Sequence, residues 1–231
     1  MTKAAIVTGG SRGLGRALAQ ALVERGWEVV IDGRDAAAVE VAVARLGPRS
    51  HGVAGDVTDR AHRAELVATA TSLGSLSLVV NNASTLGASP LPRLSEFPLD
   101  TLVDVYVANT VAPLGLVQLA LPALIENQGA IVNLTSDAAL EGYEGWGGYG
   151  SSKAALEQLS NVLAVEEPAV RVWWFDPGDM RTQMHQDAFP GEDISDRPEP
   201  ATVVPALVRL VEERPPSGRV RASDLLIGAS S

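Results

Sequence analysis

Short apolar runs alternate with longer amphipathic segments along most of the chain. Most of the apolar runs show little alternation between apolar and polar residues, and they begin at Ala4, Val29, His51, Leu76, Ala130 and Val170. Strands that are covered on both faces have this pattern, as in a parallel sheet. The intervening segments, such as residues 14–25 and 61–72, are rich in Ala, Leu, Glu and Arg at helical spacing. This repetition predicts an α/β fold, a doubly wound parallel sheet of about seven strands with helices on both faces.

Two of the predicted helices are long. One covers residues 99–126, where Pro113 and Pro122 are expected to bend it or shorten its end. The other covers residues 147–167 and ends before Pro168, because the residue that precedes a proline disfavours helical geometry.

The rest of the chain suggests no subdivision. Residues 179–200 are polar, irregular and rich in proline, which predicts a lid over a substrate site. No repeat or linker interrupts the 231 residues, so we expect residues 1–231 to form a single domain.

Composition narrows the possible partners. The formal net charge of −10 argues against nucleic-acid binding, and the absence of cysteine excludes disulfides and thiolate chemistry. The chain begins almost directly with a strand-like run, without a signal peptide, and we find no apolar stretch long enough to span a bilayer. These features predict a cytoplasmic protein that contacts no membrane.

The first predicted strand ends in a glycine-rich turn, Thr8-Gly9-Gly10-Ser11-Arg12-Gly13-Leu14-Gly15, directly before a helix. Glycines allow the backbone to approach a pyrophosphate, and the helix N-terminus offers free N–H groups to it. The spacing Gly-x-x-x-Gly-x-Gly differs from the commoner Gly-x-Gly-x-x-Gly. A tight strand–helix connection alone would also use glycines, but the position after the first strand favours a dinucleotide site.

The second strand ends in Ile31-Asp32-Gly33-Arg34, where a dinucleotide fold meets the adenosine ribose. An acidic residue there selects the 2′-hydroxyl of NAD, whereas arginine suits the 2′-phosphate of NADP. Arg12 and Arg34 therefore favour NADP(H), while Asp32 leaves NAD(H) possible.

Three residues have the spacing of an acid/base centre. Ser136 follows the strand-like run AIVNL, Tyr149 comes thirteen positions later, and Lys153 lies four positions further on. The last two share one helix face, so the ammonium is expected to lower the pKa of the phenol. Tyr149 can then exchange a proton with a carbonyl or alcohol oxygen, to which Ser136 donates a hydrogen bond.

With these motifs in this order, the chain resembles the short-chain dehydrogenase/reductase (SDR) family, in its compact single-domain branch with a Rossmann fold. The resemblance covers about residues 3–182 and includes Asn81-Asn82-Ala83, Asn109 and the turn 177–182. It implies catalytic roles for Asn109, Ser136, Tyr149 and Lys153. It also implies cofactor contacts from Thr8, Gly9, Ser11, Arg12, Gly13, Leu14, Gly15, Arg34, Asp56, Val57, Asn82, Ala83, Tyr149, Lys153, Pro177, Gly178 and Thr182.

The resemblance assigns individual tasks to several of these residues. Asp56 would hold the adenine amino group, Asn109 would organise a proton-relay water with Lys153, and Lys153 would bind the nicotinamide ribose. The chain departs from the family pattern at Ser84, where glycine is usual, and at Asp176, where asparagine is usual before Pro-Gly.

The resemblance also places the substrate pocket beneath the loop after Ser136, the turn after Pro177 and the lid. The main candidates for substrate contact are Asp137, Tyr143, Trp146 and Met184, with Met180, His185 and Phe189 nearby. The aromatic side chains suit a flat or cyclic carbonyl compound, or they pack the loop or a subunit interface. The histidines show no metal-ligand spacing, so we expect no metal. Family members commonly associate through the two long helices, which predicts a homodimer or homotetramer.

The sequence thus predicts an NADP(H)-dependent oxidoreductase that acts on a carbonyl or alcohol substrate, with the ketoreductase direction favoured. One alternative is an NAD-dependent alcohol dehydrogenase of the same family. Others are a related epimerase, dehydratase or halohydrin-cleaving enzyme, or a protein that senses NADP(H) without turnover.

Overall fold

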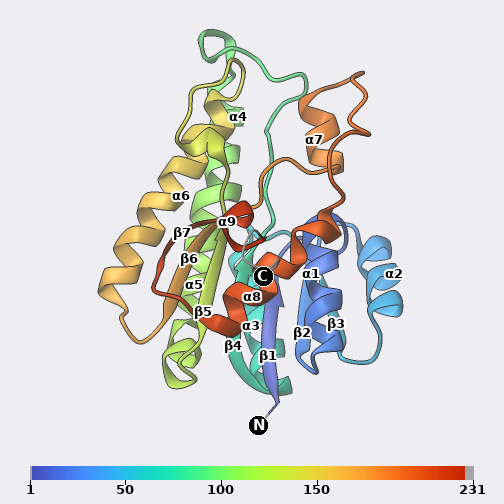
Figure 1. Ribbon diagram of the computed structural model, residues 1–231, viewed down its shortest axis with the longest axis vertical. Helices are drawn as coiled ribbons and strands as arrows, with labels where there is room; N and C mark the ends of the chain where they lie inside the picture. Colours follow the sequence, from blue (N-terminus) through green and yellow to red (C-terminus); the bar gives the residue numbers. More distant parts are fainter. Residues whose placement is uncertain (1, 227–231) are drawn as a thin grey trace.

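Seven parallel strands form one sheet in the computed structural model, which describes residues 2–226 (Figure 1). The strand order is β3-β2-β1-β4-β5-β6-β7, as predicted for a doubly wound sheet. The strands are β1 (Lys3–Val7), β2 (Glu28–Gly33), β3 (Ser50–Ala54), β4 (Ser75–Asn81), β5 (Ala130–Leu134), β6 (Arg171–Asp176) and β7 (Gly218–Arg221). The apolar runs predicted the first six, whereas β7 has the polar sequence GRVR and gave no such signal.

Helices cover both faces of the sheet. The helices are α1 (Gly13–Glu24), α2 (Ala36–Leu46), α3 (Arg60–Leu73), α4 (Leu99–Tyr106), α5 (Ala112–Glu126), α6 (Gly147–Glu166), α7 (Gln183–Ala188), α8 (Val204–Glu213) and α9 (Ala222–Leu226). One core contains residues of α1, α2, α8 and α9, and the other contains residues of α3, α5 and α6 (Figure 1). In β1, Ala5 and Val7 enter the first core, whereas Ala4 and Ile6 enter the second. Two buried faces explain why this strand shows no polar alternation.

The long helix predicted at residues 99–126 is continuous but not uniform. α4 passes into a wider π-helical turn at Val107–Val111, and α5 follows at Ala112. Pro113 lies in the first turn of α5, and Pro122 lies inside it. The π turn contains Asn109, which is fully buried.

This run also corrects the expectation about membrane-spanning segments. Residues 99–126 form 28 helical residues, and the most apolar window of 18 among them has a mean hydropathy of 1.5, enough by length and composition to cross a membrane. Within its most apolar stretch, 44 % is buried inside the fold, and a core helix of a soluble protein has the same properties. The observation is weak evidence for a membrane segment.

Two further helical predictions have different outcomes. α6 ends at Glu166, just before Pro168, as expected. The segment 179–200 is not irregular throughout, because α7 lies within it. The hydroxyl of Thr182 caps α7 by accepting a hydrogen bond from the backbone N–H of His185 at 3.2 Å.

The parallel sheet brings the carboxyl ends of its strands to one edge. The strand order reverses between β1 and β4, which lie side by side although residues 8–74 separate them in sequence. Ligands of doubly wound sheets bind outside this reversal point. The glycine-rich turn after β1 and the segment 82–84 after β4 therefore meet there.

Gly150 allows α6 to approach the turn Asp137–Ala139 that follows Ser136. A Cβ at Gly150 would overlap with the carbonyl oxygen of Ala138, a backbone atom that cannot rotate away. Replacement by alanine, although favoured by helix propensity, is therefore expected to destabilise the protein by about 1–3 kcal/mol.

Thermal unfolding of Gly150→Ala would measure this loss. Gly142→Ala is the matched control, because no atom lies within 4 Å of a Cβ there. Equal melting temperatures for the two variants would contradict the close approach of α6.

Candidate active site

The glycine-rich turn has the backbone geometry that its sequence predicted. Gly9 and Gly13 adopt positive φ angles of 63° and 56°, which side-chain-bearing residues rarely tolerate. A Cβ at Gly15 would lie 2.6 Å from the carbonyl oxygen of Gly9. α1 begins at Gly13, and no side chain caps its N-terminus. The first N–H groups of the helix thus face the position expected for phosphates.

The segment after β4 holds this turn in place. The hydroxyl of Thr8 accepts hydrogen bonds from the backbone N–H groups of Asn82 and Ala83, each at 3.0 Å. The amide nitrogen of Asn82 donates to the carbonyl oxygens of Thr8 and Gly9 at 2.8 and 3.2 Å. Asn82 therefore joins the ends of β1 and β4, whatever contact it makes with a cofactor.

The structure changes the interpretation of Asp32, whose carboxylate is almost completely buried. One oxygen accepts a hydrogen bond from the N–H of Gly9 at 2.6 Å, and the other lies 3.0 Å from Nε2 of His62. Both oxygens are thus engaged by the protein itself, and Asp32 is not free to select a ribose hydroxyl. Within residues 2–226, no group of three or more His, Cys, Asp or Glu side chains is placed to hold a metal ion.

Arg12 and Arg34 remain available beside the turn. Both are exposed, and neither forms an ion pair with another residue in the described part of the chain. Arg34 is close enough to Asp56 to affect its ionisation. Burial opposes ionisation of Asp56, but hydrogen bonds from Thr58 and the charge of Arg34 outweigh it, so the pKa lies below its usual value.

Tyr149 and Lys153 lie one turn apart on α6, as their spacing predicted. Tyr149 is 8 % exposed and Lys153 is 2 % exposed. The ammonium nitrogen of Lys153 donates to the carbonyl oxygen of Leu134 at 2.8 Å and lies 5.5 Å from the ring centroid of Tyr149. Ser136 lies two residues after Leu134 in the chain. Its hydroxyl accepts a hydrogen bond from the N–H of Ala138 at 3.2 Å and donates one to the carboxylate of Asp137 at 2.9 Å.

The pKa values of the pair differ from expectation. Burial raises the pKa of Tyr149, the charges of Asp176 and Asp137 raise it further, and a hydrogen bond with Ser84 opposes them. Burial also lowers the pKa of Lys153 to about 7. Burial thus outweighs the lowering of the phenol pKa that Lys153 was expected to produce, because desolvation disfavours both the phenolate and the ammonium.

Ser84, a departure from the family pattern, connects Tyr149 with Asn109. Its hydroxyl donates to the side-chain oxygen of Asn109 at 3.0 Å. The same oxygen accepts from the N–H of Thr85 at 2.9 Å, and the amide nitrogen of Asn109 donates to Ser152 at 3.0 Å. A glycine at position 84 would remove the contacts of this hydroxyl with both Asn109 and Tyr149.

A small apolar cluster covers the ring of Tyr149. Trp146 meets it edge to face with ring centroids 5.6 Å apart, and Phe189 lies 6.0 Å from Trp146. Met184 of α7 packs against the same cluster. The predicted lid therefore lies against Tyr149, and the candidates Trp146 and Met184 pack together there.

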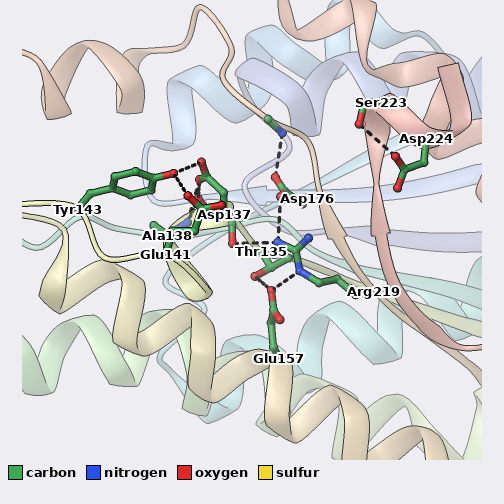
Figure 2. Close-up of polar contacts among 12 residues, drawn as sticks. Thr135, Asp137, Ala138, Glu141, Tyr143, Glu157, Asp176, Arg219, Ser223 and Asp224 are labelled. Atoms are coloured by element: carbon green, nitrogen blue, oxygen red, sulfur yellow. Dashed lines mark hydrogen bonds and ion pairs between the residues drawn. The ribbon is translucent and has the colours of Figure 1, made fainter. Parts of the chain in front are cut away.

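Tyr143 and Asp137 occupy the rim instead. Tyr143 is 43 % exposed, and its hydroxyl lies 3.0 Å from a carboxylate oxygen of both Asp137 and Glu141 (Figure 2). The hydrogen bonds with Glu141 and Asp137 raise the pKa of Tyr143 to about 12. Tyr143 is thus not part of the cluster around Tyr149.

The turn after β6 faces the glycine-rich turn. The N–H of Gly178 donates to the carboxylate of Asp176 at 3.0 Å. A Cβ at Gly13 would lie 3.8 Å from the methyl group of Thr182. The segment 177–182 and the turn 8–15 are therefore neighbours at this edge of the sheet.

Sequence reasoning did not identify the roles of Asp32, His62, Ser84 and Arg219. His62 and Asp32 are 30 positions apart, so no motif connects them. Ser84 and Asp176 were visible only as departures from a family pattern. Such departures are the one signal that would have pointed to a changed local network.

Comparison with known proteins agrees with this geometry. The family model for short chain dehydrogenases matches residues 3–193. A serine 3-dehydrogenase of Rhizobium radiobacter is 36 % identical over 187 residues, which cover 79 % of this chain and 74 % of that protein.

Two solved structures are also similar. A short chain dehydrogenase of Shigella flexneri complexed with NADP has a TM-score of 0.88 and 27 % identity, over 96 % of this chain and 97 % of that one. One of Escherichia coli complexed with NADPH has a TM-score of 0.87 and 28 % identity, over 95 % and 96 % of the two chains. With its seven-stranded sheet, glycine-rich turn and matching family model, the chain belongs to the short-chain dehydrogenase/reductase family of oxidoreductases.

Proposed function

We propose that the protein is an NADP(H)-dependent oxidoreductase that transfers hydride between nicotinamide and a carbonyl or alcohol substrate, with carbonyl reduction as the favoured direction. The observation that carries the proposal is the arrangement at the carboxyl edge of the sheet. There the buried Tyr149 and Lys153 lie beside the turn of Ser136, while the glycine-rich turn and the exposed Arg12 and Arg34 occupy the same edge.

The residues present fit NADP(H). Arg12 and Arg34 would hold the 2′-phosphate through charge-assisted hydrogen bonds, and Asp56 with Val57 would hold the adenine. Asp32, the one feature that favoured NAD(H), has both carboxylate oxygens engaged by Gly9 and His62. Structural neighbours that contain NADP or NADPH support the same choice. When bound, the nicotinamide donates or accepts the hydride.

Tyr149 would supply the proton that a reduced carbonyl oxygen needs. Its hydroxyl is protonated at neutral pH and would donate that proton as negative charge develops on the carbonyl oxygen. Ser136 would donate a hydrogen bond to the same oxygen and stabilise its developing charge. Lys153, held by the carbonyl of Leu134, would orient the cofactor ribose and favour the phenolate that remains after proton transfer.

The substrate would lie between Ser136 and the lid. The cluster around Trp146 and Met184 offers apolar and aromatic surface, and Asp137 offers a carboxylate next to the catalytic serine. Because one relative is named serine 3-dehydrogenase, a β-hydroxy amino acid belongs in any test panel. A cytoplasmic location, and a site without metal, remain predictions.

We also propose a homodimer or homotetramer. Large apolar side chains are exposed on the two long helical segments, namely Leu99, Val103 and Val111 on residues 99–111, and Val162 and Val165 on α6. Exposed apolar residues that gather on helices are typical of protein interfaces.

The acid/base role predicts the effect of removing one hydroxyl. Tyr149→Phe should lower turnover by about 100- to 10,000-fold, because general acid catalysis is lost while cofactor binding remains. NADPH consumption with a panel of ketones, aldehydes and quinones measures this, with L-serine and NADP in the reverse direction. Tyr106→Phe at the end of α4 is the control and should retain activity. Tight NADPH binding by the wild type without any turnover would instead favour a cofactor-sensing protein.

The cofactor assignment predicts two different binding phenotypes. Arg34→Ala should weaken NADPH binding by about 10-fold or more and leave NADH binding unchanged, since only NADPH carries the 2′-phosphate. Asp32→Ala should weaken both cofactors by the same factor, because it releases Gly9 and not a ribose hydroxyl. Titration calorimetry gives both dissociation constants. A selective loss of NADH binding in Asp32→Ala would identify Asp32 as the ribose-selecting residue.

The oligomer proposal is tested by sedimentation velocity. The wild type should sediment as a dimer or tetramer, and Val103→Glu should shift it toward the monomer, because a charge would enter an apolar interface. Glu40→Gln on α2, away from both long helices, should leave the state unchanged. A monomeric wild type would refute the proposal.

A further inference from the structure

Arg219 of β7 joins the loop that carries Ser136 to the turn that follows β6. Its Nη2 atom donates to the carboxylate of Asp176 at 2.9 Å (Figure 2). The same atom donates to the carbonyl oxygen of Ser136 at 3.2 Å. Its Nε atom donates to the carboxylate of Glu157 at 3.0 Å. The side chains of Arg219, Asp176 and Glu157 are only 18 %, 7 % and 11 % exposed. One guanidinium thus connects β7, β6, α6 and the end of β5.

The contact with Glu157 extends to the end of β5. Glu157 lies one helical turn beyond Lys153 and accepts a hydrogen bond from the hydroxyl of Thr135 at 2.7 Å. Lys153 binds the carbonyl oxygen of Leu134, and Arg219 binds that of Ser136. Three successive residues, 134 to 136, are therefore held by side chains of α6 and β7. The position of the catalytic serine depends on this set of contacts.

The contact with Asp176 has an electrostatic consequence. The other carboxylate oxygen of Asp176 accepts a hydrogen bond from the N–H of Gly178. The asparagine that is usual in the family could accept the same bond. The aspartate adds a buried negative charge, which reaches Tyr149 and raises its pKa. Arg219 places a positive charge 2.9 Å from that carboxylate. The departure from the family pattern at position 176 is thus matched by an arginine from a distant strand.

Other groups also face the phenol. Lys153 lies on the same helix, Asp137 follows Ser136, and Ser84 approaches from the segment after β4. On the lid, His185 stacks on Phe189 at a centroid distance of 5.0 Å. Among these groups, Asp176 is the acid that has a fixed cationic partner.

We propose that Arg219 is a positioning residue of the active site. It binds both the carbonyl oxygen of Ser136 and the carboxylate of Asp176, and its positive charge compensates the negative charge of Asp176 near Tyr149. The electrostatic part rests on the proposed role of Tyr149 as acid/base, whereas the positional part concerns the loop geometry alone. Arg219 touches neither substrate nor cofactor in this assignment and acts through its partners.

Four variants separate charge from geometry. Arg219→Met removes both, whereas Asp176→Asn removes the negative charge and one acceptor oxygen but keeps an amide oxygen for the N–H of Gly178. The double variant Asp176→Asn/Arg219→Met removes the charge pair. Arg219→Lys keeps the positive charge but loses the rigid fork that reaches two carboxylates. Arg221→Met is the matched control, since Arg221 is exposed on the same strand and forms no ion pair with a residue in positions 2–226.

The first measurement is the pH profile of alcohol oxidation with NADP, using the panel compound that turns over fastest. Arg219→Met should raise the apparent pKa of the rising limb by about one unit, and Asp176→Asn should lower it by a similar amount. The double variant should return near the wild type. Arg219→Lys should keep the wild-type pKa while kcat falls by about 10-fold, since a displaced catalytic group loses orientation.

The second measurement needs no turnover. The chain has three tyrosines, so 3-fluorotyrosine can be incorporated and the resonance of Tyr149 assigned by comparison with Tyr149→Phe. Fluorine substitution lowers the phenol pKa, and titration by ¹⁹F NMR then reports the midpoint of Tyr149 directly. We expect this midpoint to rise in Arg219→Met and to fall in Asp176→Asn. Thermal unfolding of each variant identifies any that fail to fold, and the isosteric Asp176→Asn keeps the test valid in that case.

The outcomes distinguish a failure of the proposal for Arg219 from a failure of the proposed function. Opposite shifts that cancel in the double variant support the proposal, even if no panel compound turns over and the proposed function fails. Normal turnover with an unchanged Tyr149 midpoint in both single variants overturns the proposal and leaves the function intact. Shifts of equal size in Arg221→Met would also overturn it, because any lost cation would then suffice.

Discussion

The loops at the carboxyl edge of the sheet depend on side chains for hydrogen bonds that the strands no longer supply. A buried backbone N–H or C=O without a partner costs about as much as a lost hydrogen bond, so each loop needs such a contact. The pairs are Gly9 with Asp32, Ala83 with Thr8, Thr85 with Asn109, Leu134 with Lys153, Ser136 with Arg219, and Gly178 with Asp176. This requirement defines the shape of the cofactor turn and of the catalytic centre together.

The same requirement places ionisable groups where burial changes their chemistry. Lys153 must reach a backbone carbonyl inside the protein, and burial there brings its pKa to about 7. Tyr149 lies beneath the apolar cluster of the lid, which raises its pKa. Both shifts disfavour the charged form of the group, as burial requires. The apolar cover of the lid and the buried backbone contact of Lys153 thus act on the two side chains in the same sense.

Much of the architecture follows from local sequence pattern. Six of the seven strands were visible as apolar runs, because strands with two buried faces contain few polar residues. The turn 8–15 and the pair Tyr149 and Lys153 were visible because glycine conformation and helical spacing are local properties. The strand β7 was not visible, since its sequence is short and polar. The π turn around Asn109 was not predicted, because the sequence pattern of residues 99–126 indicated one continuous helix.

The sequence by itself determined the parallel α/β fold, the family, and the residues able to bind a dinucleotide and transfer a proton, since these depend on periodicity and short spacings. Only the tertiary structure decided how those residues are used. It engaged Asp32 with His62, 30 positions away. It joined Asp176 to Arg219, 43 positions away, close enough to Tyr149 to affect its pKa. Such pairs depend on which strands and helices become neighbours, and a buried charge accepts whatever partner the packing of the whole chain brings within reach.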